Sequence, residues 1–151
     1  MAKKTTVELP PNIKEFSEIT AVMFSQLYES FPVDRNLNPA EIATALGVVD
    51  PLAPLPSGRS FNSVLISTLG LLIRESFIHS YGNLQRERCV LATKAMAVMN
   101  VVPPKLKQPF ASELSNAMQN SSSEASKRRL ADLMGSFFGS FAGSIWKSMG
   151  G

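Results

Sequence analysis

The chain has one histidine and one cysteine, His79 and Cys89, and these side chains are the best suited to nucleophilic chemistry. They lie on two strand-like runs that would form a hairpin, which would bring them close together across the strands. A histidine beside a cysteine can activate a thiolate. No third group that would orient such a pair is evident. Ordinary packing is therefore the favoured interpretation, and we do not expect an enzyme.

Metal and phosphate chemistry have no matching pattern. One histidine and one cysteine cannot complete a zinc site without carboxylates, and no cluster supplies them. The run "GSFFGS" lacks the Lys-Ser/Thr pair of a phosphate-binding loop. The sequence therefore predicts no cofactor and no metal. A single cysteine also excludes an internal disulfide, which favours a reducing, cytoplasmic location.

Neither end of the chain resembles a membrane or export signal. The start, "MAKKTTVELPPN", has two lysines but no apolar run behind them, so we do not expect a signal peptide. The longest apolar-rich run near the other end, Leu133 to Trp146, has 14 residues. A bilayer span needs about 20.

Side chains that can contact DNA gather in the middle of the chain. Residues 1–56 carry four lysines and arginines against seven acids, whereas residues 57–100 carry five against two. Cations contact phosphates, and Arg, Lys, Asn and Gln can read base edges. The candidate DNA-contacting residues lie in a predicted helix and in the hairpin that follows it: Arg59, Asn62, Ser63, Gln85, Arg86 and Arg88.

The elements that would position these residues are mainly helices. We expect a first helix from Asn12, with Asn12 as the N-cap and Glu15 completing a capping box. A second, short helix follows Asn38, which is its N-cap, with Pro39 at the first helical position. Gly47 is expected to end this second helix.

A third helix is predicted from about Ser60, after a proline-rich loop. The runs "FIHSY" and "RCVLA" predict two strands of a hairpin, and Thr93 then caps a fourth helix. Weaker periodicity predicts a short helix within residues 110–118. A last helix is expected over residues 124–149.

The stretch "LLIRESFIHSYGNLQRERCVLATKAMAVMN" resembles the core of winged-helix regulators of the MarR and PadR type. The order of the elements extends this resemblance over residues 14–102. Ser76 stands where those regulators have a glycine before the strand. The resemblance implies that the third helix enters the major groove of duplex DNA and that the hairpin, or wing, touches the backbone or minor groove. The alternative is a winged-helix-like fold that no longer reads DNA and serves as a protein-interaction module.

The last predicted helix has a ridge of small residues on one side and aromatic residues on the other. Each glycine within a helix costs about 1 kcal/mol relative to alanine, and close approach of another helix would offset that cost. The expected interface comprises Gly135, Gly139, Gly143, Phe137, Phe141 and Trp146. Three occupants remain open: the chain's own domain, a second copy or protein partner, and, less favoured, an anionic membrane surface.

The sequence therefore predicts a mainly α protein in three parts. A winged-helix-like domain covers residues 12–102, and a Pro/Ser-rich linker with a short helix covers residues 103–123. A Gly/Ser-ridged amphipathic helix covers residues 124–149. We expect a non-enzymatic, regulator-type DNA-binding protein, and we expect a fragment of residues 1–109 to fold alone.

Overall fold

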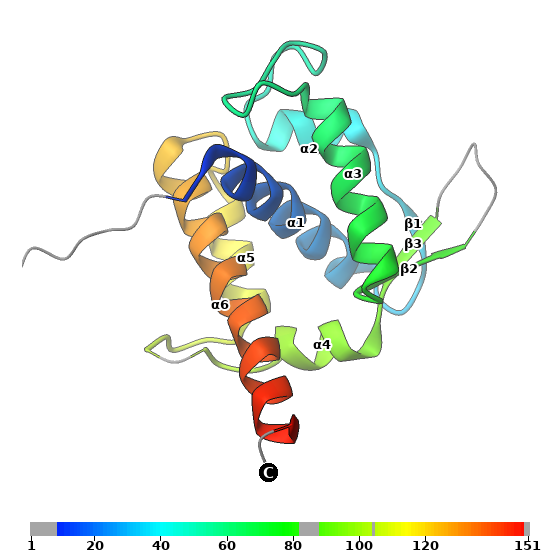
Figure 1. Ribbon diagram of the computed structural model, residues 1–151, viewed down its shortest axis with the longest axis vertical. Coiled ribbons are helices and arrows are strands. Elements are labelled where there is room, and N and C mark those ends of the chain that lie inside the picture. Colours follow the sequence, from blue (N-terminus) through cyan, green and yellow to red (C-terminus); the bar gives the residue numbers. More distant parts are fainter. Residues whose placement is uncertain (1–8, 82–87, 104, 150–151) are drawn as a thin grey trace, which may run out of the picture.

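A computed structural model describes residues 9–81, 88–103 and 105–149 of the 151-residue chain, with side chains described up to Ser140. Helices dominate the fold and confirm the mainly α prediction (Figure 1). The elements in chain order are α1 (Pro11–Ser30), β1 (Arg35–Asn36), α2 (Pro39–Ala45), α3 (Phe61–Arg74), β2 (Ile78–Tyr81), β3 (Arg88–Leu91), α4 (Thr93–Met99), α5 (Phe110–Met118) and α6 (Glu124–Met149).

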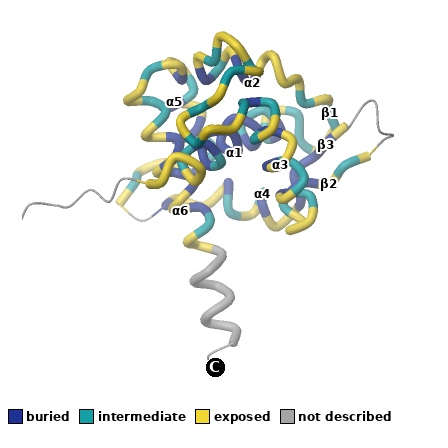
Figure 2. Tube along the Cα trace, turned by 45° about the horizontal axis from the view of Figure 1, so that its top comes forward, coloured by how far each residue is buried: buried dark blue, intermediate teal, exposed yellow. Residues whose placement is uncertain are grey.

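Helix α1 is the centre of the molecule. It is buried along most of its length, and the other helices surround it (Figure 2). Both α3 and α6 pack against it, as do α5 and strand β3. Its side chains Phe24 and Leu27 are fully buried. A helix that is enclosed on several sides must be apolar on several faces. Helix α1 therefore provides a large part of the hydrophobic core.

The predicted cap of α2 is confirmed, whereas the predicted cap of α4 is wrong, because Thr93 is the first residue of that helix and no side chain caps it. The Asn38 side chain accepts hydrogen bonds from the backbone N–H groups of Ala40 (2.9 Å) and Glu41 (3.4 Å), and Pro39 is the first residue of α2. Gly47 follows α2 with a φ of +71°, a left-handed conformation that favours glycine. Ser60 caps α3 by accepting from the Ser63 N–H.

The predicted start of α1 is wrong. The helix begins at Pro11, so Asn12 lies inside it and no side chain caps it. Proline at the first helical position has a suitable φ and lacks an N–H that would need a partner. The Glu15 carboxylate therefore forms no capping box. It accepts instead from the backbone N–H of Ser57, in the loop before α3.

The hairpin is confirmed, and it belongs to a small antiparallel sheet with the order β1-β3-β2. Strand β1 contains only two residues, and no sequence pattern predicted it because alternation needs a longer run. Arg35 pairs with Cys89, and Ile78 pairs with Leu91. The sheet therefore places the segment before α2 beside the second strand of the hairpin.

The sequence boundary at residues 103–123 does not separate two cores. Phe110 and Leu114 of α5 are buried together with Phe24 of α1, Leu72 of α3 and Phe137 of α6 in one cluster. The predicted linker instead contributes core residues, because Phe110 and Leu114 lie one helical turn apart and α5 packs against α1 and α6. The structure thus joins the three predicted parts into one hydrophobic core.

Candidate functional site: the outer face of α3 and the hairpin

Helix α3 buries one face and exposes the other. Phe61, Leu65, Thr68 and Leu72 are buried, at three- and four-residue spacing. The opposite face looks into solvent and carries the residues that the sequence put forward for DNA contact. The chain folds this way here because Ser60 ends the proline-rich loop and provides the N-cap.

The three predicted contact residues at the start of α3 are brought together. Arg59 and Ser63 are exposed, and Asn62 is half-buried. The backbone N–H of Asn62 is bonded to the Pro51 carbonyl (3.1 Å), which fixes the loop against the helix. Arg59 therefore lies immediately before a helix whose first turn presents short polar side chains.

The hairpin residues divide into two groups. Gln85 and Arg86 lie outside the described residues. Arg88 is described, and its guanidinium is engaged within the chain: Nε donates to Asp34 Oδ2 at 2.7 Å, and Nη2 donates to the Asp34 carbonyl at 2.9 Å. The pair fixes β3 beside the segment that leads into β1. Arg88 is thus a structural residue as well as a candidate contact.

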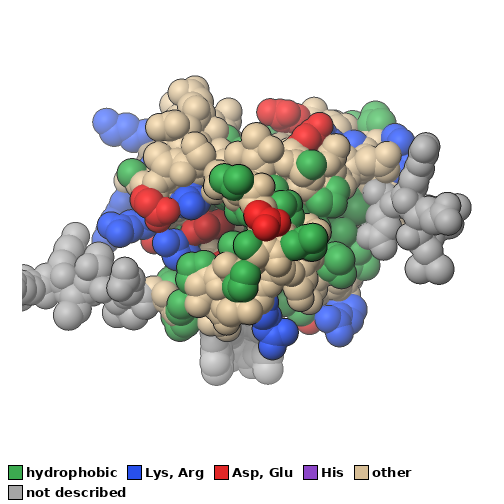
Figure 3. Space-filling model, turned by 90° about the horizontal axis from the view of Figure 1, so that it is seen from above, with side chains coloured by type: hydrophobic (Ala, Val, Ile, Leu, Met, Phe, Trp, Pro, Cys, Tyr) green, Lys and Arg blue, Asp and Glu red, His purple; other side chains and the backbone are tan. Residues whose placement is uncertain are grey.

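Sequence reasoning missed two features of the exposed α3 face. Ile66 is 68% exposed and Leu71 is 39% exposed, and only Arg74 adds a charge at the far end. The helical spacing from Ser63 places Ile66 on this face, but the sequence prediction considered only polar side chains there. On the face seen in Figure 3, lysines and arginines lie mainly toward the edges, with apolar and acidic side chains between them.

The suspected cysteine–histidine pair does not form. His79 pairs with Val90 across the strands and is exposed, whereas Cys89 pairs with Ser80 and is fully buried. Because successive strand residues point to opposite faces, the imidazole and the thiol are on opposite sides of the sheet. Within the described residues, no group of three or more His, Cys, Asp and Glu side chains could hold a metal ion.

The ridge on α6 faces solvent. Gly135 and Gly139 are exposed, and a Cβ added at either would meet no atom within 4 Å. Among the described residues, no helix covers the ridge at these two glycines. Helix α6 packs on the chain's own domain through its other face, where Met134 and Phe137 are buried in the core. Gly143 lies within α6, but its surroundings and the side chains of Phe141 and Trp146 lie outside what the structure describes.

Phe137 is not available to a partner. It is completely buried and has edge contacts with Phe24 (5.2 Å between ring centroids) and Phe110 (5.8 Å). The aromatic side of α6 is thus, at this residue, part of the chain's own core. The predicted interface residue Phe137 is corrected to a core residue.

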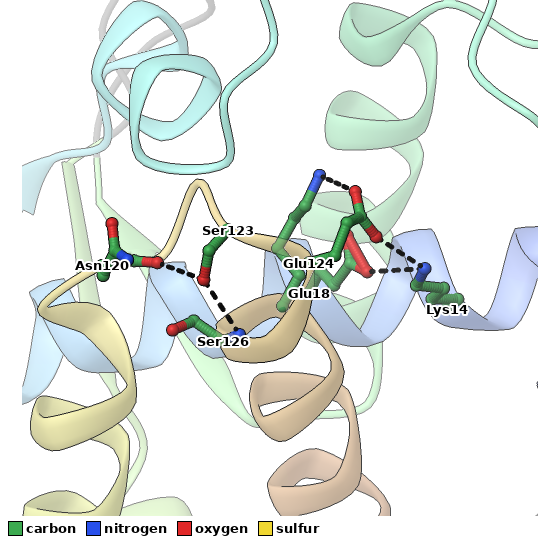
Figure 4. A network of polar contacts seen from close by, with 7 residues as sticks. Lys14, Glu18, Asn120, Ser123, Glu124 and Ser126 are labelled. Carbon is green, nitrogen blue, oxygen red and sulfur yellow. Dashed lines mark hydrogen bonds and ion pairs between the residues drawn. The ribbon is translucent and has the colours of Figure 1, made fainter.

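A polar network joins the first turns of α1 and α6 (Figure 4). Lys14 lies 4.0 Å from Glu18 and 3.6 Å from Glu124, which also pairs with Lys127. Burial raises the pKa of Glu18 from 4.5 to about 7, although Lys14 and Lys127 oppose the shift. The hydrogen bond from Lys127 lowers the pKa of the exposed Glu124. The network links α6 to α1 by ion pairs.

The described helices include none with both the length and the apolar character of a membrane span. The candidate functional site is the surface built from the loop before α3, the outer face of α3 and the hairpin. No protein-family model, no curated protein and no solved structure matches the chain.

Proposed function

We propose that the segment from α1 to α4 is a winged-helix-like domain and that the protein is a non-enzymatic, regulator-type DNA-binding protein. The observation that carries the proposal is topological. Two helices, α2 and α3, lie between β1 and a β2–β3 hairpin, and the sheet order is β1-β3-β2. This arrangement leaves the outer face of α3 exposed next to the hairpin, as a groove-reading helix beside a wing requires.

The side chains at the start of α3 support this proposal. In helix-turn-helix proteins, the N-terminal residues of the reading helix contact base edges. Here those positions carry Asn62 and Ser63, preceded by Arg59. An arginine suits phosphate or guanine, and an amide suits adenine. The thin set of cations predicts weak binding that depends strongly on salt.

Duplex binding is tested by an electrophoretic shift of mixed-sequence DNA across a salt series. We expect binding at about 50 mM salt that disappears as salt increases. Arg59→Ala together with Arg74→Ala should weaken binding and reduce the salt slope by about 1 for each phosphate that is no longer neutralised. Arg128→Ala, an exposed arginine on α6, removes the same kind of charge elsewhere and should leave binding nearly unchanged.

The apolar part of the same face favours a second candidate function, a protein-interaction module. Ile66 is 68% exposed and Leu71 is 39% exposed on α3, and an exposed apolar patch, if these side chains are part of one, marks a protein-interaction site. If no duplex binds at about 50 mM salt, the DNA proposal fails. Concentration-dependent association in sedimentation equilibrium that is removed by Ile66→Ser would then support the module.

A further inference from the structure

A small cavity lies between the first turns of α1 and the outer side of α3, beside the loop that precedes α3. Its volume is about 210 Å³. Pockets for drug-sized ligands usually have about 300–1,000 Å³, so this cavity suits a smaller molecule. Phe16, Val64 and Leu71 give it apolar walls, which would shield the aliphatic part of a ligand from water.

A buried carboxylate lines this cavity. Glu15 is 7% exposed, and its Oε2 accepts from the Ser57 N–H at 2.9 Å. Its other oxygen, Oε1, is enclosed by protein and has no hydrogen-bond partner among the described residues. A buried acceptor without a donor is unfavourable. The terminal torsion of a glutamate is soft, so the carboxylate of Glu15 can rotate toward a donor that enters the cavity.

Arg59 lines the same cavity and is exposed. It follows Ser57, whose backbone N–H is bonded to Glu15, by two residues. The ion pairs of the described residues do not join Arg59 to Glu15. A guanidinium can bind a carboxylate through two parallel N–H bonds. The cavity therefore has one acidic and one basic residue that are not joined to each other, with apolar walls beside them.

We propose that this cavity binds a small zwitterion, a free amino acid with an aliphatic side chain. The ammonium group would donate to Glu15, the carboxylate would accept from Arg59, and the side chain would lie against Phe16, Val64 and Leu71. A simple amine would leave Arg59 without an anion, and a simple acid would leave the Glu15 acceptor unmet. The proposal does not depend on DNA binding.

The chemistry is tested on the full chain with three probes that share a branched aliphatic body: L-leucine, 3-methylbutylamine and 4-methylpentanoate. Titrations are followed by amide NMR and by calorimetry. We expect L-leucine to give saturable shifts around residues 12–16 and 57–71, with an affinity at least tenfold above either other probe. No saturable shift with L-leucine, or shifts confined to other regions, would overturn the proposal. Equal affinity for the amine would overturn the role of Arg59.

Two substitutions test the location. Glu15→Gln should weaken L-leucine binding at least tenfold. Because Glu15 is buried and its replacement could alter folding, Ser67→Phe provides a second variant: Ser67 is exposed on α3 and lines the cavity, so a ring there should fill it and abolish binding. Ile66→Phe, at an exposed neighbour outside the lining, is the matched control and should bind normally. Normal binding by the Ser67 variant would place the ligand elsewhere and overturn the proposal.

Discussion

Single residues show where this fold stores unfavourable free energy. Glu18 is a carboxyl group buried between α1 and α6, and burial raises its pKa to about 7. Ser76 has a φ of +62°, in the left-handed region that L residues other than glycine avoid. Each residue is unfavourable at its position, and a different side chain should be more stable there.

Glu18 should make stability depend on pH. Its folded pKa is above its unfolded value of 4.5, so the native state binds the proton more tightly than the unfolded state does. The contribution is therefore fully present below pH 4.5 and is lost as pH rises to about 7. Each pKa unit corresponds to about 1.4 kcal/mol, which gives a loss on the order of 3 kcal/mol.

Glu18→Gln should remove this part of the pH dependence and raise the free energy of unfolding more at pH 8 than at pH 4.5. Urea denaturation at several pH values measures it. Glu29→Gln, at an exposed position on the same helix, is the control and should follow the wild type. A pH profile for Glu18→Gln that parallels the wild type would show that the carboxyl group is not buried as described.

Ser76→Gly should stabilise the protein. The serine follows the last turn of α3, where the Phe77 N–H bonds to the Leu72 carbonyl at 2.9 Å, a helix ending that usually has glycine at the left-handed position. We expect a gain of a few tenths to about 1 kcal/mol, since relief of the strain exceeds the entropy cost of glycine. Thermal denaturation checks it, with Ser136→Gly on α6 as a control that should lose stability.

At the scale of elements, α6 has a buried aromatic face and an exposed face that carries glycines. Phe137 fills the core, whereas the opposite side exposes Gly135 and Gly139. The aromatic face is therefore partnered within the chain, and the glycine ridge is open at these two positions. Packing of the buried face stabilises the helix enough for glycines to be tolerated on the other side.

Gly139→Ala should raise the free energy of unfolding by up to about 1 kcal/mol, since a better helix former is placed where nothing obstructs its Cβ. Gly47→Ala is the contrast and should destabilise, because its φ is +71° and a Cβ there would lie 3.2 Å from Ser122 Cβ. Sedimentation of Gly139→Leu reports association. A stability loss with alanine, or a smaller mass with leucine, would show that another helix covers the ridge.

At the scale of the whole molecule, α1 packs with helices that lie both early and late in the chain. Phe24 of α1 contacts Phe137 of α6, and Phe137 contacts Phe110 of α5. Ser121, before α6, also donates a hydrogen bond to the Ala45 carbonyl in α2. The region that would bind DNA and the C-terminal helices therefore share one core and should unfold together.

A fragment of residues 1–109 should fail to fold, contrary to the expectation from composition. It lacks Phe110, Leu114 and Phe137, each fully or almost fully buried, and losing one large buried side chain alone costs about 3–5 kcal/mol. Circular dichroism and urea titration would show no cooperative transition. Residues 1–140 retain the described core side chains and serve as the control. A cooperative transition of the shorter fragment would restore the two-part organisation.

Local signals in the sequence determined most of the elements. The caps of α2 and α3 were predictable because Asn38 and Ser60 act on backbone groups within three residues. The hairpin strands were also predictable from two strand-like runs joined by turn-forming residues, and α6 was predictable from its helical period. Among the candidate contacts, the positions of Arg59 and Ser63 on an exposed helix start follow from the same periodicity.

Only the tertiary structure decided which surfaces are paired. Nothing local to Arg88 indicates that Asp34 would hold its guanidinium, or that Glu15 would accept from Ser57 instead of capping α1. Composition made residues 103–123 look like a linker, although Phe110 and Leu114 reach the core. These outcomes depend on contacts between residues far apart in the chain, and spacing within one segment carries no information about the side chains that the fold brings to it.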